Sequence, residues 1–459
     1  MIKSINELDG FFNSYNPSLG SGKLRENRLD RMRILLSELG NPELSYKTIH
    51  IAGSKGKGTT AIYLSKIIKE NGFKCGLYMS PHVYDLRERF SLSGEFFSLD
   101  DYLKAANELE IVVSKLVFDE SLGLDKPTTF ELYTAYAFLL FKNTGCDYAV
   151  IETGMGGRLD ATNVINPIAS VFTAIELEHT NVLGETLKEI ATEKSGIIKD
   201  KTPVFVTNYD DEIMDVIQEK ADSKKAPIYK FSKEATVYSN FKYNEKNDSI
   251  DTIISVNGQD YSLSMDSISS IKGFDSMYAF FITAMLGINK KDSIDLSSVT
   301  MPARYEEKPL AINQDKIIRF IYDGAHTPLS VFMTMDTIIR HFKIKQDESG
   351  HEVLRGEACL ILSFADGKKI EEMLHILVPY FQNVIITGCG SFKKSNPEEI
   401  YKLAKEVSPS HDISMIEDPV KAVTRAMRRV DKFGTVFVIG SFYLCAEIKN
   451  ALKELGYES

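Results

Sequence analysis

The chain has 459 residues, of which 43% are hydrophobic and 26% are charged. A single hydrophobic core rarely grows this large, so we expect a globular chain with two domains. The formal net charge of −10 excludes a broad nucleic-acid-binding surface, because such a surface needs a basic stripe that displaces counterions from phosphates. Any phosphate site must therefore be local.

The five cysteines are scattered and contain no CxxC pair, which fits neither a disulfide framework nor a zinc site. We expect them to be reduced. Met1–Gly20 is polar and mixed in charge, unlike a secretory signal, and no apolar stretch approaches the roughly 20 residues that cross a bilayer. The sequence thus predicts a cytoplasmic protein that does not contact a membrane.

The first half of the chain alternates between helical and strand patterns. Periodicity predicts a helix over Leu24–Leu39, followed by a short β-branched strand over Thr48–Ala52, a glycine-rich turn over Gly53–Thr59 and a helix over Thr60–Asn71. Strands that alternate with helices predict a mostly parallel sheet covered on both faces. The later expected strands are Cys75–Met79, Tyr148–Glu152 and Ile168–Ile175, and the later expected helices are Phe130–Asn143 and Leu187–Ile197.

The sequence pattern changes in Ala235–Met265. Short strands with alternating apolar and polar residues surround Asn257-Gly258 there, a dipeptide that suits a tight hairpin turn. We expect a small antiparallel appendage there. A polar stretch then leads into a second βα series, so we expect one domain over 1–298 and another over 299–459. The charged segment Lys343–Glu357 is expected to be a solvated loop.

The turn Gly53–Thr59 carries the strongest local chemical signal. A glycine turn at a strand end lets successive backbone N–H groups face a polyphosphate at a helix N-terminus, and Lys57 adds a point charge. The spacing is not that of a Walker loop, because only two residues separate Gly53 from Gly56. On these residues alone, a plain turn with exposed lysines remains an alternative.

Ile51–Thr59 resembles the nucleotide loop of the folylpolyglutamate synthase and dihydrofolate synthase family, a branch of the Mur ligases, whose usual form is GTNGKGS. The resemblance continues in order and spacing over nearly the whole chain, and it is densest from Ile49 to Lys199. The further matching segments are Tyr78-Met79-Ser80-Pro81-His82, Glu88-Arg89, Thr129-Phe130-Glu131, Glu152–Asn163, His179-Thr180, Glu193–Lys199, Arg304-Tyr305-Glu306, Asp323-Gly324-Ala325-His326 and Gly440-Ser441-Phe442-Tyr443.

The resemblance implies an α/β fold. A P-loop-containing, mostly parallel ATP-binding and catalytic domain with a small antiparallel appendage would be followed by a smaller Rossmann-like ligase domain. It also implies an ATP-dependent amide ligase of folate metabolism that adds L-glutamate to folate, to dihydropteroate or to both through an acyl phosphate, and releases ADP and phosphate. The implied enzyme is a monomer that requires Mg²⁺, with one or two ions bound.

The resemblance also implies roles for individual residues. Catalytic roles fall on Lys57, Lys194 and His326. Nucleotide contacts fall on Gly53, Ser54, Lys55, Gly56, Lys57, Gly58 and Thr59, with Arg304 and Asp323 from the second domain. Without the resemblance, either of these last two residues is equally well an ordinary surface charge.

Magnesium prefers hard oxygen donors, which suits the carboxylate of Glu152 and the hydroxyls of Thr59 and Ser80. Glu152 ends an apolar strand, where open α/β sheets usually place ligand groups, although a solvated turn carboxylate is the alternative. An imidazole is a poor magnesium ligand, and His179 alone would be a structural hydrogen-bonding residue. The resemblance instead implies that His179 helps to hold a second metal.

Lys194 has two interpretations. Its neighbours Glu189 and Glu193 suit a surface ion pair on a helix, whereas the resemblance implies a carbamylated lysine that supports the metal ions. Carbamylation requires a lysine with a depressed pKa, because only the neutral amine captures carbon dioxide.

The resemblance places a pterin pocket at Thr129, Phe130, Leu159 and Asp160. A flat heterocycle needs an aromatic or aliphatic wall with a few polar anchors, which these residues can supply. Phe130 taken alone is better explained as part of the core of its helix.

The chain departs from the family pattern at several positions. Ser54-Lys55 replaces Thr-Asn, Glu178 replaces an aspartate before His179, and Tyr278-Ala279 stands where an Asn-Ala pair contacts adenine in relatives. Thr327 replaces an asparagine, and Asp366-Gly367-Lys368 replaces a DKD segment. These departures leave three alternatives open: a Mur-type ligase with a non-folate carboxylate, a ligase-derived nucleotide-binding module without activity, and a plain P-loop NTPase or kinase.

Overall fold

The computed structural model describes residues 1–15, 26–232, 237–244, 249–266, 270–342, 344–346, 352–354, 358–390 and 394–457. The chain divides into two compact units, and it passes from the first to the second after Ser298. The first unit comprises Met1–Ser267 and Lys272–Ser298, and most of the second lies in Val299–Ser459.

A seven-stranded sheet forms the centre of the first unit, in the order β3-β2-β4-β1-β5-β6-β7. Its strands are β1 (Lys47–Ala52), β2 (Cys75–Tyr78), β3 (Phe90–Leu92), β4 (Tyr148–Glu152), β5 (Ala169–Phe172), β6 (Val204–Val206) and β7 (Ile228–Lys230). All described pairs are parallel except β2 with β3. The mostly parallel sheet is confirmed, and β1 lies at its middle between β4 and β5.

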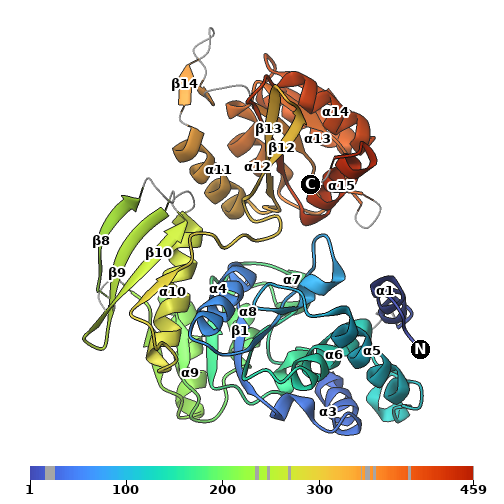
Figure 1. Ribbon diagram of the computed structural model, residues 1–459, viewed down its shortest axis with the longest axis vertical. Coiled ribbons are helices and arrows are strands. Elements are labelled where there is room, and N and C mark those ends of the chain that lie inside the picture. Colours follow the sequence, from blue (N-terminus) through green and yellow to red (C-terminus); the bar gives the residue numbers. More distant parts are fainter. Residues whose placement is uncertain are drawn as a thin grey trace. The chain divides into compact units, whose positions relative to one another are not determined.

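Helices pack along this sheet (Figure 1). They are α1 (Ile5–Asn13), α3 (Arg28–Glu38), α4 (Lys57–Glu70), α5 (Leu99–Val113), α6 (Thr129–Asn143), α7 (Thr180–Leu183), α8 (Leu187–Ser195), α9 (Asp211–Ser223) and α10 (Ser270–Met285). Helix α4 contacts β1, β2 and β4 directly. One apolar cluster joins α6 to β2 and β4, and a second joins α8 and α9 to β1, β5 and β6. Both clusters fix the ends of the central strands.

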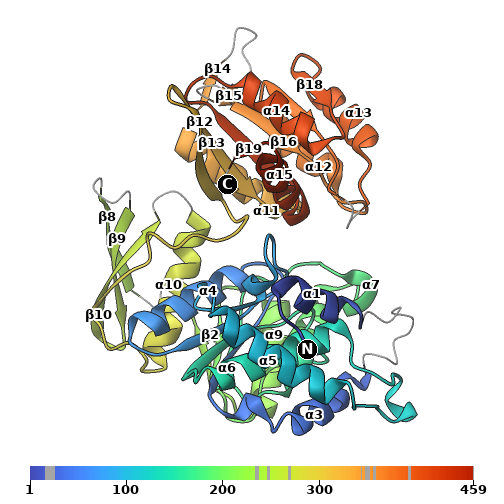
Figure 2. The same cartoon turned by 45° about the vertical axis from the view of Figure 1, so that its right-hand side comes forward.

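The predicted appendage is a small four-stranded sheet of β8 (Val237–Asn244), β9 (Ser249–Val256), β10 (Gln259–Asp266) and β11 (Ser293–Asp295). Its hairpin turns at Asn257 and Gly258, which have φ values of 52° and 79°. β8, β9 and β10 pair antiparallel, while β11 runs parallel to β10. Figures 1 and 2 show this sheet beside α10, and the rings of Tyr261 and Phe280 meet there at 5.1 Å.

The second unit contains a six-stranded sheet in the order β12-β13-β19-β16-β17-β18. Its strands are β12 (Glu306–Asn313), β13 (Lys316–Asp323), β16 (Ala358–Leu362), β17 (Asn383–Ile386), β18 (Asp412–Met415) and β19 (Thr435–Ile439). Its helices are α11 (Pro328–Phe342), α12 (Ile370–Leu377), α13 (Pro397–Val407), α14 (Pro419–Arg429) and α15 (Phe442–Glu454). Only β12 pairs antiparallel here, so the expected second α/β domain is confirmed.

The expectation of a solvated loop over Lys343–Glu357 is wrong for the residues that are described. Ile344–Gln346 (β14) and Glu352–Leu354 (β15) pair antiparallel, and Val353 and Leu354 are buried. The prediction failed because the many charged residues of this segment outnumber the few apolar residues that form its strands. Of the predicted helix over Leu24–Leu39, Leu24 lies outside the described residues and α3 begins at Arg28.

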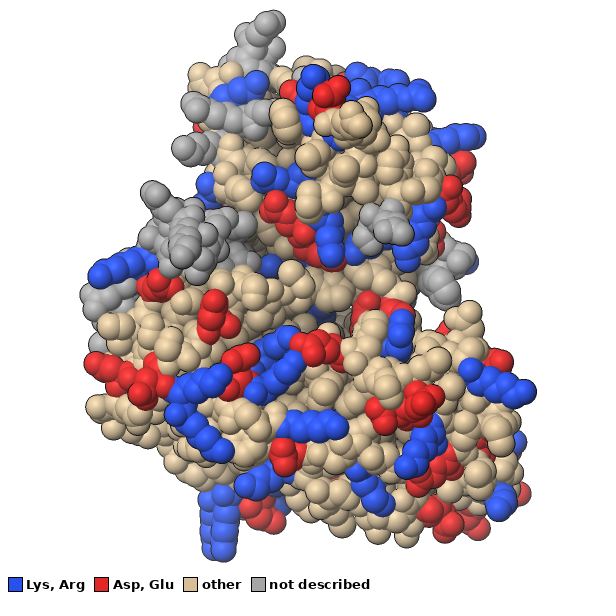
Figure 3. Space-filling view, viewed as in Figure 1, with Lys and Arg blue, Asp and Glu red and all other residues tan. Residues whose placement is uncertain are grey.

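All five cysteines are free and buried. Figure 3 shows acidic and basic side chains interspersed over the visible face of each unit, without a continuous basic stripe among the residues drawn in colour. Within the described ranges, every helix is too short or too polar to span a membrane.

Candidate active site

The turn after β1 approaches the end of β5 too closely for any residue but glycine at position 53. A Cβ atom on Gly53 would lie 1.9 Å from Oγ1 of Thr173. Gly56 has a φ of 83° and precedes the first residue of α4, and no side chain of the described residues caps this helix. The glycines therefore shape a turn whose helix N-terminus has no side-chain cap among the described residues, a geometry that suits an anionic ligand.

Ser54 ties this turn to the segment that follows β5. Its hydroxyl accepts the N–H of Glu176 at 3.0 Å and donates to the carbonyl of Glu176 at 3.1 Å. The N–H groups of Ser54 and Lys55 both donate to the carbonyl of Ala174, at 2.6 and 3.3 Å. Ser54, one of the departures from the family pattern, thus has a defined structural role.

Two lysines converge on the carbonyl oxygen of Gly53. Nζ of Lys57 and Nζ of Lys194 each lie 2.8 Å from this oxygen, and Nζ of Lys194 also lies 3.0 Å from Oε1 of Glu178. Burial and the nearby charge of Lys57 lower the pKa of Lys194 to about 8, although Glu178 opposes this shift. Burial alone would raise the pKa of Glu178, but Lys194 and Lys57 outweigh it and lower that pKa.

The interpretation of Lys194 as a surface ion-pair partner is wrong. Its side chain is only 1% exposed, and its acidic partner is Glu178. Glu193 pairs with Arg158 at 2.7 Å, and the carboxylate of Glu189 caps its own helix through Thr186. Sequence spacing suggested the wrong partners because the true ones lie outside the helix.

Two glycines position Lys194 by allowing the chain segments around it to pack closely. A Cβ atom on Gly157 would lie 2.6 Å from the carbonyl oxygen of Lys194, and one on Gly196 would lie 2.4 Å from Cα of Arg158. The loop after β4 therefore packs directly on the C-terminal turn of α8. This contact explains why the glycine-rich loop after β4 and the end of α8 both lie in segments that match the family pattern.

The structure brings two of the four predicted metal ligands together. Glu152 ends β4 and is 3% exposed, and its Oε2 accepts the N–H of Ser80 at 3.0 Å. Thr59 lies in the first turn of α4, whereas His179 is exposed and precedes α7 with a φ of 49°. No group of three or more His, Cys, Asp or Glu side chains arranged to hold a metal occurs in the described part of the chain.

Two of the predicted pterin residues are partly exposed apolar side chains, and the other two make hydrogen bonds within the protein. Phe130 and Leu159 are partly exposed, and the ring of Phe130 covers Gly154, where a Cβ atom would lie 2.2 Å from Cζ. The hydroxyl of Thr129 donates to the carbonyl of Tyr15 at 3.0 Å. Asp160 is buried and accepts the N–H groups of Met155 and Thr162, so its carboxylate holds the loop.

Tyr278 does not present its hydroxyl to the outside of the unit. It is fully buried in α10, and its hydroxyl donates to the carbonyl of Phe172 at 3.1 Å. The position at which the resemblance implies an adenine contact is therefore occupied by a core side chain in this structure.

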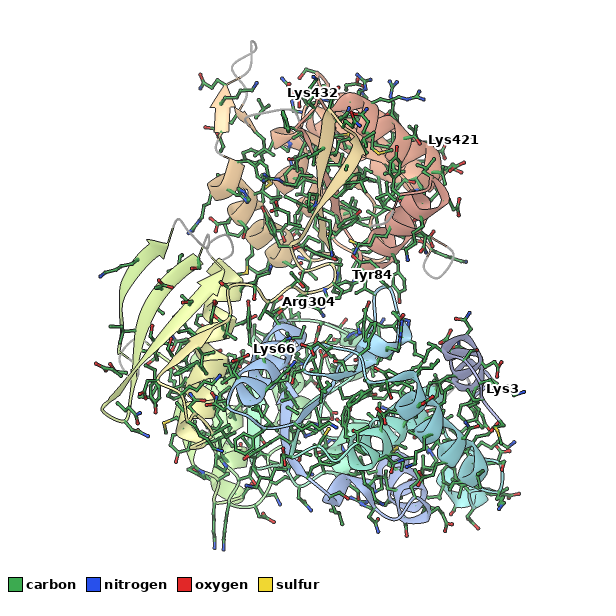
Figure 4. The ribbon with its side chains drawn as sticks, in the orientation of Figure 1. Lys3, Lys66, Tyr84, Arg304, Lys421 and Lys432 are labelled. Carbon is green, nitrogen blue, oxygen red and sulfur yellow. The ribbon has the colours of Figure 1, made fainter. Side chains whose placement is uncertain are left out.

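The predicted residues of the second unit lie near one another. Asp323 ends β13 and accepts the N–H groups of Tyr305 and Ala325 at 2.9 and 2.8 Å. Arg304, on the segment that leads into β12 (Figure 4), lies over the ring of Phe442 at 5.1 Å. The ring of His326 contacts the same phenylalanine, and its Nδ1 lies 2.7 Å from the carbonyl oxygen of Gly324.

Comparison with known proteins connects this geometry to a family. The family model described as Mur ligase middle domain matches residues 51–273, and that described as dihydrofolate synthetase, C-terminal domain, matches residues 307–452. A dihydrofolate synthase/folylpolyglutamate synthase of Bacillus subtilis is 26% identical over 446 residues, which cover 93% of this chain and 95% of that protein. The chain belongs to the folylpolyglutamate synthase and dihydrofolate synthase family of Mur ligases.

Solved structures of this family share the fold. A folylpolyglutamate synthase of Thermotoga maritima is 27% identical with a TM-score of 0.73, and the match covers 93% of each chain. A Mycobacterium tuberculosis folylpolyglutamate synthase complexed with ADP is 24% identical with a TM-score of 0.80, and the match covers 97% of each chain.

Sequence reasoning about this family member missed two acidic residues near the glycine turn. Glu178 was visible only as a departure from the family pattern, and nothing in the sequence linked it to Lys194. Asp275 lies beside Gly56, with both carboxyl oxygens 3.6 Å from the position of a Cβ atom on that glycine. The sequence signal that could have identified Asp275 is that it is the one acidic residue in a mostly apolar helix.

Proposed function

We propose that the chain is an ATP- and magnesium-dependent amide ligase that joins L-glutamate to the carboxylate of a folate, of dihydropteroate or of both. The observation that carries this proposal is the convergence of Lys57 and Lys194 on the Gly53 carbonyl at the N-terminus of α4. The family membership supports the same activity, and the ADP complex of the Mycobacterium relative supports nucleotide binding.

The residues of the first unit fit a magnesium ion. Magnesium is usually held by one or two carboxylates together with substrate phosphates and waters, and the buried carboxylate of Glu152 beside Ser80 provides such a donor. Thr59 would add a hydroxyl, and His179 would act at a second ion. The ion, when bound, supplies positive charge against the phosphate oxygens.

The chain's own groups would act mainly by charge and position. The N–H groups at the start of α4 and the ammonium of Lys57 would stabilise negative charge on the γ-phosphoryl group as it passes to the substrate carboxylate. The resulting acyl phosphate is attacked by the amine of glutamate, which releases phosphate. Phe130 and Leu159 would hold the pterin, and exclusion of water would protect the acyl phosphate from hydrolysis. Arg304 and Asp323 would contact the nucleotide, and His326 would have a catalytic role.

Carbamylation of Lys194 is part of this proposal. A pKa of about 8 leaves about one tenth of the amine neutral at pH 7, far more than for an ordinary lysine. A carbamate would place a second negative charge near Glu178, so it requires a cation there. This requirement is consistent with a metal-dependent ligase.

A test offers dihydropteroate, tetrahydrofolate and a folate diglutamate separately, each with and without glutamate, while ATP turnover is measured. We expect turnover that depends on both a folate-type acceptor and glutamate. Phosphate release that ignores glutamate would favour an NTPase or kinase, and activity with none of the acceptors would favour a non-folate carboxylate or an inactive module. We further propose that the enzyme is a cytoplasmic monomer. Size-exclusion chromatography with light scattering tests the oligomeric state.

A further inference from the structure

Asp275 is a buried carboxyl group beside the glycine turn. It lies in α10 with 6% of its surface exposed, and each of its two carboxyl oxygens lies 3.6 Å from the position of a Cβ atom on Gly56. Gly56 is the residue that precedes α4, so the carboxyl group lies next to the helix N-terminus to which the proposed function assigns polyphosphate.

This carboxyl group lacks the partners that buried carboxylates usually have. Its Oδ2 atom has no hydrogen-bond partner in the described part of the chain. The titratable group beside it is Tyr278 on its own helix, whose pKa is raised chiefly by burial. Lys57 follows Gly56 but donates to the carbonyl of Gly53. Burial raises the pKa of Asp275 to about 8.

The protonation state of this group matters for an anion at the turn. An ionised carboxylate next to Gly56 would repel a polyphosphate through a poorly solvated region, where charges interact more strongly than in water. A protonated acid is neutral, and its O–H can donate a hydrogen bond to a phosphate oxygen.

We propose that Asp275 is a positioning residue of the nucleotide loop that admits a nucleoside polyphosphate only when its carboxyl group is protonated. This inference rests on the proposed function, because it requires the glycine turn to bind phosphate. The competing interpretation is a buried acid that stabilises or strains α10 without influencing the ligand. The two interpretations differ in the pH dependence of nucleotide affinity.

The test compares the Kd of ADP for the wild type, Asp275→Asn and the control Asp222→Asn between pH 7 and 9.5, with saturating Mg²⁺. The terminal phosphate of ADP is about nine tenths ionised at pH 7 and fully ionised above pH 8, since the second pKa of a phosphate group is about 6. Asp222 is an exposed residue of α9, so its substitution removes one negative charge away from the turn.

The ratio of the wild-type Kd to the Asp275→Asn Kd should rise from about 1 at pH 7 to about 30 at pH 9.5, because the fraction of protonated acid falls above a pKa of about 8. Other titrating groups are the same in both proteins, so their effects cancel in this ratio. The control should stay within twofold of the wild type throughout.

A ratio that stays constant across the pH range would overturn the inference. If Asp275→Asn does not fold, Asp275→Ser removes the same charge and gives the same comparison. Absence of ADP binding in the wild type at every pH would instead contradict the proposed function. The two failures are therefore distinguishable.

Discussion

The turns after β1 and after β13 both follow a parallel strand, but their charged side chains have different partners. After β1, the ammonium groups of Lys57 and Lys194 bind one carbonyl oxygen, that of Gly53, and therefore lie close together. After β13, the carboxylate of Asp323 accepts two backbone N–H groups. The first turn concentrates positive charge, whereas the second uses its charge to hold its own backbone.

This difference separates residues that present charge from residues that shape a loop. Removal of a residue of the first kind should change catalysis, because the charge acts on the ligand, and it should lower stability only where that charge also belongs to a buried ion pair, as for Lys194. Removal of the second kind should change the backbone and therefore stability as well. The predictions below test this separation, from the largest expected effect to the smallest.

Lys57→Ala should abolish turnover, with a loss of about three orders of magnitude or more, because a charge-assisted contact to the transferring phosphoryl group is removed. The thermal unfolding midpoint should change by only a few degrees. The matched control is Lys66→Ala on the same helix (Figure 4), where Lys66 forms a surface ion pair with Glu95. Near wild-type activity in Lys57→Ala would remove the nucleotide-loop assignment.

Lys194→Ala should abolish turnover and also lower stability by about 3 kcal/mol, since it breaks a buried ion pair and leaves Glu178 without its cation. If Lys194 is carbamylated, acetate or formate at constant ionic strength should partly restore the rate by replacing the lost carboxylate. Intact-protein mass spectrometry of the wild type checks the modification directly.

Lys199→Ala is the control for this experiment. Lys199 also has a pKa lowered to about 8, chiefly by burial, but its Nζ donates to the carbonyl of Asn163. Its substitution should leave turnover within a few-fold of the wild type, and acetate should have no effect. A fully active Lys194→Ala variant would disprove the carbamate, and an inactive one that acetate does not restore would give it no support.

Glu152→Gln should raise the Mg²⁺ concentration required for half-maximal turnover by at least tenfold, because a neutral amide is a weaker magnesium ligand. His179→Ala should raise this requirement less, since an imidazole contributes little to magnesium binding. Titration of Mg²⁺ at saturating ATP measures both effects. Unchanged metal dependence in both variants would exclude the proposed metal site.

Asp275→Asn should stabilise the protein progressively between pH 5 and pH 7, by about 3 kcal/mol relative to the wild type over that range. The folded-state pKa of about 8 exceeds the ordinary value of 3.8, so folding retains a proton that the unfolded chain releases. Wild-type stability is therefore lost as pH rises from 3.8 to about 8, and the variant escapes this loss. Urea unfolding at several pH values provides the measurement, and parallel pH profiles would contradict the raised pKa.

The sequence predicted local structure around the first turn well. The strand over Thr48–Ala52 and the following helix agree with β1 and α4, because β-branched residues, glycines and helical periodicity act within a few positions. The helix starts three residues earlier than predicted, at Lys57, since Lys57, Gly58 and Thr59 were assigned to the turn. The hairpin at Asn257-Gly258 was predictable for the same local reason.

Long-range partners were not predictable from the sequence. Lys194 contacts Gly53 across 141 positions, and its flanking glutamates gave a plausible but wrong ion pair. The burial of Tyr278 and the use of Asp160 to hold backbone N–H groups also depend on tertiary packing. A single sequence records which residues can carry charge, but packing decides what they contact.

The central claim is that the substrate carboxylate is activated as an acyl phosphate at the turn after β1. Its most direct test is turnover of an acceptor whose reacting carboxylate carries ¹⁸O, in the presence of ATP, Mg²⁺ and glutamate, with mass analysis of the phosphate released. The carboxylate oxygen that bonds to phosphorus leaves with phosphate when glutamate attacks the carbonyl carbon. The account predicts one ¹⁸O atom in each phosphate formed from fully labelled acceptor, and unlabelled phosphate released during glutamate-dependent amide formation would contradict it.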